Sequence, residues 1–225
     1  MKNIYSKIRI GRHFSRLGFV IALYFSFGLI QQQSRPLMFT LAIIAGVFFC
    51  GWLCPFGALQ EYIGMFGKRF LKKQFRMPEK IHKHIQWFRY SLYLLVPMGF
   101  GYVFIFDPQN STISFFSGQI LTILSWVVVI SFLILAFFFE RPFCNYFCIE
   151  GAQLGALSLL RVFTIKRDRD KCIDCKICDK NCPMNIKIST KKQVRSPNCV
   201  NCFNCLATCP TKALSYGFVI GKNKK

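Results

Sequence analysis

Two runs of cysteines near the C-terminus constrain this 225-residue chain more than any other feature. Both have the spacing C-x2-C-x2-C-x3-C and are followed directly by proline: Cys172, Cys175, Cys178 and Cys182, then Cys199, Cys202, Cys205 and Cys209. Disulfide frameworks rarely place neighbouring cysteines only two or three residues apart, whereas metal sites do. The surrounding segment is polar and rich in loops, so we expect bound metal to hold it together.

This spacing is that of the bacterial ferredoxin run, which holds [4Fe-4S] clusters. Three thiolates of one loop bind one cluster, and the fourth cysteine of the run reaches the other cluster. We therefore expect cluster I on Cys172, Cys175, Cys178 and Cys209, and cluster II on Cys199, Cys202, Cys205 and Cys182. Zinc is the alternative, but zinc sites usually pair C-x2-C units across a longer spacer.

Apolar residues between the cysteines are expected to shield both clusters from water: Ile173, Ile177, Val200 and Phe203. Shielding and hydrogen bonds to sulfur tune the reduction potential of such clusters over a wide range. The sequence therefore predicts two redox centres without predicting their potentials.

The remaining cysteines form two C-x3-C pairs within an internal repeat, because residues 49–58 (FCGWLCPFGA) match residues 143–152 (FCNYFCIEGA). On a helix, thiols four residues apart share one face. Repeats packed about a pseudo-twofold axis would bring together Cys50, Cys54, Cys144 and Cys148. Four converging thiols would bind a third iron–sulfur cluster, zinc or Cu(I), or each pair would cycle between dithiol and disulfide. Otherwise they are buried apolar residues.

The composition indicates contact with lipid, since 53% of the residues are hydrophobic and only 17% are charged, against a usual charged share of about 25%. A bilayer-spanning helix needs about 20 apolar residues. Four stretches approach this length: Leu17–Ile30, Leu37–Leu53, Tyr90–Phe106 and Ile120–Phe139. We expect four transmembrane helices in two helix-pair repeats, the first being retained rather than cleaved as a signal peptide.

The charge is strongly positive, with 30 Lys and Arg against 9 Asp and Glu. Basic residues are frequent in the first sixteen positions, in Pro55–Arg89 and in the chain after Arg141, whereas Asp107–Gly118 has none. By the positive-inside rule, this predicts a multi-pass protein of the bacterial cytoplasmic (inner) membrane with both termini in the cytoplasm. Topology and lipid contact explain the charge better than nucleic acid does, because no nucleic-acid-binding motif accompanies it.

Three segments are expected: a four-helix transmembrane domain over residues 1–165, a small α+β 2[4Fe-4S] ferredoxin-like domain over 166–217, and a basic tail over 218–225. Within the first, one helical face is expected to lie in the membrane interface; it carries Leu59, Tyr62, Ile63, Phe66 and Phe70. No catalytic triad, phosphate loop or flavin fingerprint is visible, so no catalytic residue is assigned.

The run from Cys50 to Gln60 (CGWLCPFGALQ), the second C-x3-C pair and the double ferredoxin run together resemble the NapH/NosR/CcoG group of membrane polyferredoxins. The resemblance covers nearly the whole chain and is closest in size to NapH-type proteins. It implies quinol oxidation, with a quinone as ligand, or electron transfer to a partner reductase. The chain departs from the family motif at Ile149, where the family has proline.

Three functions remain open: a quinol dehydrogenase-like electron-transfer subunit of a larger oxidoreductase, a thiol-based copper reductase or respiratory-complex assembly factor, and a cluster-bearing anchor for a soluble oxidoreductase. In each case we expect a membrane or peripheral redox partner. An acidic docking face on that partner would complement the basic residues of the ferredoxin segment. These are Lys171, Lys176, Lys180, Lys187, Lys191, Lys192, Arg195 and Lys212.

Overall fold

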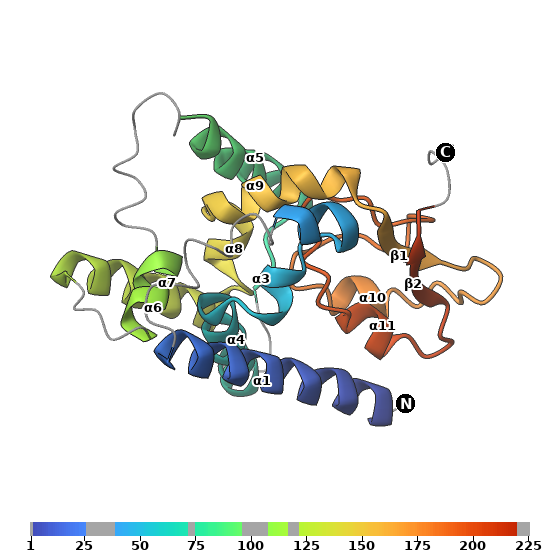
Figure 1. The fold of residues 1–225 in the computed structure, drawn as a ribbon. Helices are drawn as coiled ribbons and strands as arrows, with labels where there is room; N and C mark the ends of the chain where they lie inside the picture. Colours follow the sequence, from blue (N-terminus) through green and yellow to red (C-terminus); the bar gives the residue numbers. More distant parts are fainter. Residues whose placement is uncertain (1, 26–38, 72–74, 96–107, 117–121, 220–225) are drawn as a thin grey trace.

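The fold is a set of packed helices joined to a C-terminal ferredoxin segment (Figure 1). The structure, a computed structural model, describes residues 2–25, 39–71, 75–95, 108–116 and 122–219. Its helices are α1 (Lys2–Phe25), α3 (Phe48–Trp52), α4 (Pro55–Leu71), α5 (Glu79–Leu95), α6 (Pro108–Phe116), α7 (Ile123–Phe138), α8 (Pro142–Tyr146), α9 (Ile149–Leu157), α10 (Ile177–Lys180) and α11 (Asn204–Thr208). A 3-10 turn, η3 (Ser158–Leu160), precedes the strands β1 (Phe163–Arg167) and β2 (Leu214–Phe218).

The internal repeat is visible as two copies of one backbone unit, α3–Cys54–α4 and α8–Cys148–α9. The amide of Cys54 donates to the Phe49 carbonyl over 3.0 Å, and the amide of Cys148 donates to the Phe143 carbonyl over the same distance. In both copies the second cysteine directly precedes the longer helix. The sequence repeat therefore corresponds to a repeat of local structure.

Ile149 does not disturb the second copy. It occupies the first position of α9, as Pro55 occupies the first position of α4. Proline is tolerated there because the amide of that residue has no partner within the helix, so another residue fits equally well. Ile149 is only 4% exposed and packs where the family motif has proline.

The prediction of four transmembrane helices is wrong, and with it the prediction of a multi-pass protein of the cytoplasmic membrane. Within the described ranges, no helix combines the length and the apolar character that crossing a bilayer requires. Some residues of the predicted spans, numbered 26–30, 37–38, 96–106 and 120–121, lie outside the described part of the chain.

Breaks and charges shorten the apolar helices. The second stretch is interrupted at Gly46, whose φ of +81° separates the helical residues 39–45 from the five-residue α3. Helix α7 is very apolar but has 16 residues, fewer than the roughly 20 that span a bilayer. Helix α1 has 24 residues, yet its first two thirds carry Arg12 and Arg16.

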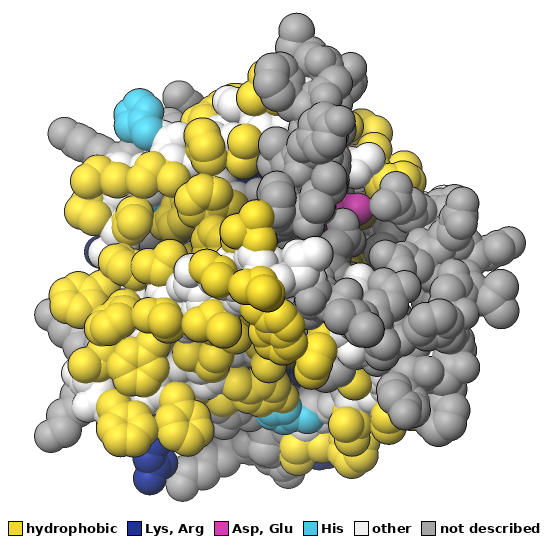
Figure 2. Space-filling view, turned by 90° about the vertical axis from the view of Figure 1, so that its left-hand side faces the viewer, with side chains coloured by type: hydrophobic (Ala, Val, Ile, Leu, Met, Phe, Trp, Pro, Cys, Tyr) yellow, Lys and Arg dark blue, Asp and Glu magenta, His cyan; other side chains and the backbone are white. Residues whose placement is uncertain are grey.

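Helix α4 packs against α7, with Phe56 and Val129 in one apolar cluster. At Gly67 an added Cβ would overlap the Phe137 carbonyl, so the two backbones are in close contact. Phe66 and Phe70 are 62% and 69% exposed. Other exposed hydrophobic side chains lie along α1, α5 and α7, and Figure 2 shows one face of the molecule on which such side chains predominate.

The C-terminal segment folds around a two-stranded antiparallel sheet, in which Phe163 of β1 pairs with Phe218 of β2. Its buried residues do not form a separate core. Val47 and Cys50 from the first repeat belong to the same hydrophobic cluster as Met184, Val194 and the cysteines of the second ferredoxin run. The ferredoxin segment is therefore packed directly onto the first C-x3-C motif, and the domain boundary at residue 166 stays a prediction.

Candidate iron–sulfur centres

The four cysteines assigned to cluster I surround one pocket. Cys172 and Cys175 lie in the loop before α10, Cys178 lies on α10, and Cys209 follows α11. Cys175 is exposed and the other three are half-buried. The fourth cysteine at this pocket thus comes from the opposite run, where the ferredoxin spacing predicts a fourth ligand.

The four cysteines assigned to cluster II are buried together. Cys182, Cys199 and Cys202 are each 8% exposed and Cys205 is 4% exposed. Burial raises the pKa of the Cys205 thiol well above its usual value, and the neighbouring thiols of Cys202, Cys199 and Cys182 raise it further. This set also combines three cysteines of one run with one of the other.

The two runs share an unusual backbone pattern. Asp174 and Lys176 have φ values of 49° and 55°, and the equivalent Asn201 and Phe203 have φ values of 44° and 57°. The third residue after the last cysteine of each run is also left-handed, namely Asn185 in the first run and Lys212 in the second. Such turns direct successive backbone amides inward and form the concave anion sites found around iron–sulfur groups. Donor chemistry and backbone therefore both fit [4Fe-4S] clusters.

Protection of the two sets from water differs. Val200, beside cluster II, is 7% exposed, whereas Ile173, beside cluster I, is 64% exposed. Ile173 nevertheless lines the pocket of cluster I, so its shielding of that cluster stays a prediction. Arg167 lies at cluster I, where its guanidinium is 3.4 Å from the Cys172 sulfur and 3.0 Å from a carboxylate oxygen of Asp174.

The second cysteines of the two C-x3-C pairs have matching surroundings. The Cys54 sulfur accepts a hydrogen bond from the Gly57 amide over 3.4 Å, and the Cys148 sulfur accepts one from the Gly151 amide over 3.2 Å. Both sulfurs therefore face a helix N-terminus, whose amides favour negative charge. Both residues also belong to one apolar cluster.

Three of the four C-x3-C thiols are electrostatic neighbours. Burial raises the pKa of Cys54 to about 12, and the Cys144 thiol adds to this increase. Burial also raises the pKa of Cys50, as do Cys54 and Cys144. The Gln60 amide donates to the Cys144 sulfur over 3.4 Å. All twelve cysteines lie in described segments and none of them forms a disulfide. No three Cys, His, Asp or Glu side chains of those segments are grouped around a single metal position.

The first C-x3-C motif touches the second ferredoxin run through its backbone. An added Cβ at Gly51 would overlap the Val200 carbonyl and lie 3.4 Å from the Cys202 amide nitrogen. The Trp52 indole donates to the Asn201 carbonyl over 3.0 Å, and its ring lies edge-on to Phe203. Sites that are about 150 residues apart in sequence are therefore adjacent.

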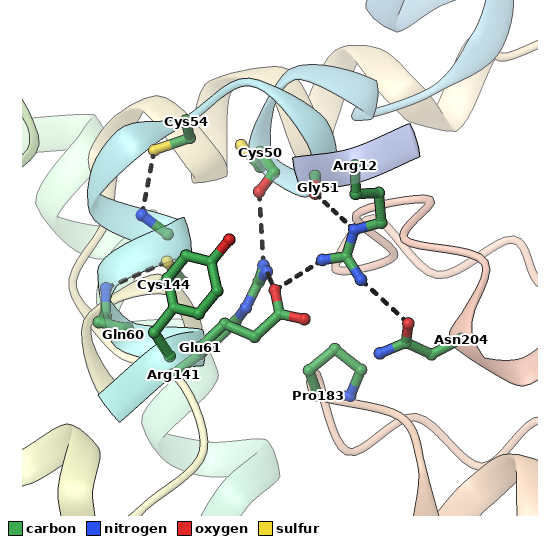
Figure 3. Close-up of polar contacts among 12 residues, drawn as sticks. Arg12, Cys50, Gly51, Cys54, Gln60, Glu61, Arg141, Cys144, Pro183 and Asn204 are labelled. Carbon is green, nitrogen blue, oxygen red and sulfur yellow. Dashed lines mark hydrogen bonds and ion pairs between the residues drawn. The ribbon is translucent and has the colours of Figure 1, made fainter. Parts of the chain in front are cut away.

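Beside this contact, three arginines surround one carboxylate, as Figure 3 shows for two of them. Guanidinium nitrogens of Arg12, Arg16 and Arg141 lie 2.6, 2.7 and 2.5 Å from the same oxygen of Glu61. Burial opposes ionisation of Glu61, but the three arginines outweigh it and hold its pKa well below the usual range. We call this group the arginine cage.

Sequence reasoning did not identify the arginine cage. A signal was available, because acidic residues are scarce in this chain and Glu61 is the one acidic residue of α4. Next to the cage an open pocket is lined by Glu61, Phe66, Lys68, Asn181 and Asn204. Asn181 and Asn204 directly precede Cys182 and Cys205, so the pocket gives solvent access close to cluster II.

Comparison with known proteins places these features in a family. The family described as "4Fe-4S binding domain" matches residues 36–74 and 120–167, and the one described as "4Fe-4S dicluster domain" matches residues 164–210. An uncharacterised protein of Methanocaldococcus jannaschii is 35% identical over 81% of this chain and 76% of its own length. The chain belongs to the NapH/NosR-type family of 4Fe-4S polyferredoxins.

Named relatives agree with this family. YccM of Escherichia coli is 34% identical over 72% of the chain and 48% of its own length. The ferredoxin-type protein NapH of Haemophilus influenzae is 26% identical over 78% of the chain and 63% of its own length. No solved structure matches the chain.

Family membership confirms the resemblance that the motifs suggested and the [4Fe-4S] cofactor. The polyferredoxin is thus an iron–sulfur electron-transfer protein. The two segments matched by the "4Fe-4S binding domain" contain the C-x3-C pairs and none of the ferredoxin cysteines. The match to an iron–sulfur family therefore includes the C-x3-C repeats as well as the ferredoxin runs.

Proposed function

We propose that this polyferredoxin is the electron-transfer subunit of a larger oxidoreductase. Cys172, Cys175, Cys178 and Cys209 would hold cluster I, and Cys182, Cys199, Cys202 and Cys205 would hold cluster II. When bound, a [4Fe-4S] cluster accepts and releases single electrons. The observation that carries the proposal is that each set of four thiols, drawn from both runs, gathers at one place.

We also propose that Cys50, Cys54, Cys144 and Cys148 hold a third iron–sulfur group. Cys50, Cys54 and Cys148 are at most 8% exposed, and burial raises the pKa of the first two. Buried thiols with a raised pKa are poor nucleophiles, which argues against dithiol–disulfide exchange with an outside substrate. The matched amide donors to Cys54 and Cys148 favour a bound anionic group instead.

The position of cluster I supports its role as the contact with a redox partner. Its pocket is at the surface, and Lys171, Lys176 and Lys180 beside it are exposed. Opposite charge on a partner would speed docking and orient it. A partner with an acidic face would therefore complement the basic surface beside cluster I, and docking should weaken as the salt concentration rises.

Quinol is the proposed electron donor. A quinol gives up two electrons, which suits a chain that holds at least two one-electron centres. The open pocket beside Asn181 and Asn204 brings small molecules close to the cysteines of cluster II. A copper reductase would instead need the C-x3-C thiols to meet copper from outside, which their burial opposes.

Iron and acid-labile sulfide counted per chain on anaerobically purified protein test the proposal, with copper and zinc counted alongside. About twelve irons are expected if all three sites are filled. Eight would remove the third group, and none would remove the electron-transfer function. Cys50→Ala and Cys144→Ala should each lower the iron count without affecting the EPR signals of clusters I and II.

Donor identity needs a separate measurement. Menadiol, a quinol, should reduce the clusters, and a quinone-site inhibitor should block this reduction. Copper-dependent reoxidation that disappears in Cys54→Ala would instead support the copper reductase. Co-purification of an acidic partner with neither reaction would support the anchor.

A further inference from the structure

The arginine cage carries more positive than negative charge. Three guanidinium groups meet one carboxylate, which leaves two positive charges without a carboxylate partner inside the cage. Its arginines are deeply buried, at 4% exposure for Arg12, 6% for Arg16 and 0% for Arg141. Burying charge without compensation is costly, so further negative charge is required nearby.

Arg141, one of the charged residues of the cage, has a strained backbone conformation. It is a large residue in the left-handed region, with a φ of 51°, directly before Pro142. A non-glycine residue in that region is strained and persists only where its surroundings hold it. Within the described part of the chain, the buried Nε atoms of Arg141 and Arg16 have no hydrogen-bond partner.

Thiol sites lie on both sides of the cage. Toward the first C-x3-C motif, Arg141 donates to the Cys50 carbonyl over 3.4 Å and Arg12 donates to the Gly51 carbonyl over 3.2 Å. Toward the second ferredoxin run, Arg12 donates to the side-chain oxygen of Asn204, between Cys202 and Cys205, over 3.0 Å. In Figure 3, Arg141, Glu61 and Arg12 lie between Cys50 of the first C-x3-C motif and Asn204 of the second ferredoxin run.

The thiols are also electrostatic neighbours of the cage. Burial acts to lower the pKa of Arg141, but Glu61 outweighs it, and the Cys144 and Cys202 thiols add to the increase. Cys202 acts in the same direction on Arg12. One guanidinium is therefore coupled to both thiol sites.

We propose that the arginine cage is a fixed counter-charge shared by the C-x3-C site and cluster II, and that it makes both easier to reduce. The inference rests on the proposed function, because it assigns anionic redox groups to these cysteines. Thiolate-bound iron–sulfur clusters are anionic, and their potential depends on net charge and surroundings. Reduction adds one negative charge, which a buried positive charge stabilises strongly because the local dielectric constant is low. The cage residues therefore do not bind either group directly. They act on the thiolate-bound groups through their charge: Arg12, Arg16, Arg141 and Glu61.

The proposal predicts opposite effects for opposite charges. Arg141→Gln and Arg16→Gln each remove one positive charge and should lower the midpoint potential of cluster II, and of the C-x3-C group where the iron count shows it. Glu61→Gln removes the negative charge and should raise the same potential. Arg141→Lys keeps the charge and should restore most of the wild-type value. The measurement is an EPR-monitored redox titration of the full chain, with iron counted for every variant.

Arg167→Gln is the matched control, because Arg167 lies beside Cys172 of cluster I and outside the cage. It should lower the potential of cluster I and leave cluster II unchanged. Arg16→Gln covers the case in which Arg141→Gln does not fold, since Arg16 keeps an ordinary helical backbone. Equal shifts of one sign for the Arg and Glu variants, or no shift with full iron content, would overturn the inference. Missing iron in the wild type would overturn the proposed function instead.

Discussion

The Trp52 indole donates a 3.0 Å hydrogen bond to the Asn201 carbonyl, and so joins the first C-x3-C motif to the loop between Cys199 and Cys202. Gly51 beside Trp52 allows the two backbones to approach. Since the two motifs share one core, the ferredoxin segment has a fixed place relative to the repeats.

Gly51→Ala should separate the two motifs. The new Cβ would overlap the Val200 carbonyl, so one backbone must move, at a cost of about 1–3 kcal/mol. Gly18→Ala on α1 is the control, because its Cβ would have no neighbour within 4 Å among the described residues; it should be neutral or slightly stabilising. Chemical denaturation measures both, and equal stability of the two variants would contradict the junction described here.

Cys182→Ala tests which run supplies the fourth ligand of cluster II. Although Cys182 follows the cysteines of cluster I in sequence, its thiol lies with Cys199, Cys202 and Cys205. The variant should lose or convert the buried cluster and keep the exposed one, and Cys209→Ala should do the reverse. Iron content and EPR spectra distinguish the two. Loss of the exposed cluster in Cys182→Ala would disprove the crossed assignment.

Glu61→Gln should be strongly destabilising, because it leaves the guanidinium groups of the arginine cage without their shared carboxylate. Removing one partner of a buried ion pair costs about 3–5 kcal/mol, and the low end is expected since the Glu61 side chain is 20% exposed. Glu140→Gln is the control: it pairs with Arg76 over 3.3 Å, and both side chains are about one third exposed. That pair should contribute less than about 1 kcal/mol.

The Glu61 contribution should depend on pH in a defined direction. Its pKa in the folded protein is far below the value of about 4.3 expected in the unfolded chain. Its stabilisation is therefore complete at neutral pH and is lost as the pH falls below about 5, at up to about 1.4 kcal/mol per pH unit. The stability gap between wild type and Glu61→Gln should be constant from pH 8 to 5 and narrow below it. A gap independent of pH down to 4, with iron retained, would contradict the assignment.

The sequence predicted the parts of the site that depend on local spacing. Each ferredoxin run spans eleven residues and each copy of the C-x3-C repeat spans ten, so local spacing is enough to predict them. The crossed sets, which combine cysteines of the two runs, follow from the ferredoxin pattern. Cys54 and Cys148 have equivalent places in the two copies of the repeat, and each directly precedes a helix, which begins at Pro55 or at Ile149.

Long-range features could not be predicted in this way. The arginine cage joins Arg12, Glu61 and Arg141 from three distant segments, and no local pattern encodes their meeting. The predicted spans failed for a related reason: hydropathy counts apolar residues along the chain, but a left-handed turn at Gly46 and charges on α1 divide those residues among short or mixed helices.

The unequal burial of the two ferredoxin sites also bears on how the protein decays in air. Cys175 and Ile173 are both exposed, whereas every cysteine of cluster II is at most 8% exposed. Dissolved oxygen reaches the first site directly and reaches the second only through packed side chains or the polar pocket beside Asn204. The centre proposed to meet the partner would therefore also be the one lost first, and aged preparations would keep an inner centre that can still be reduced but can no longer pass its electron on.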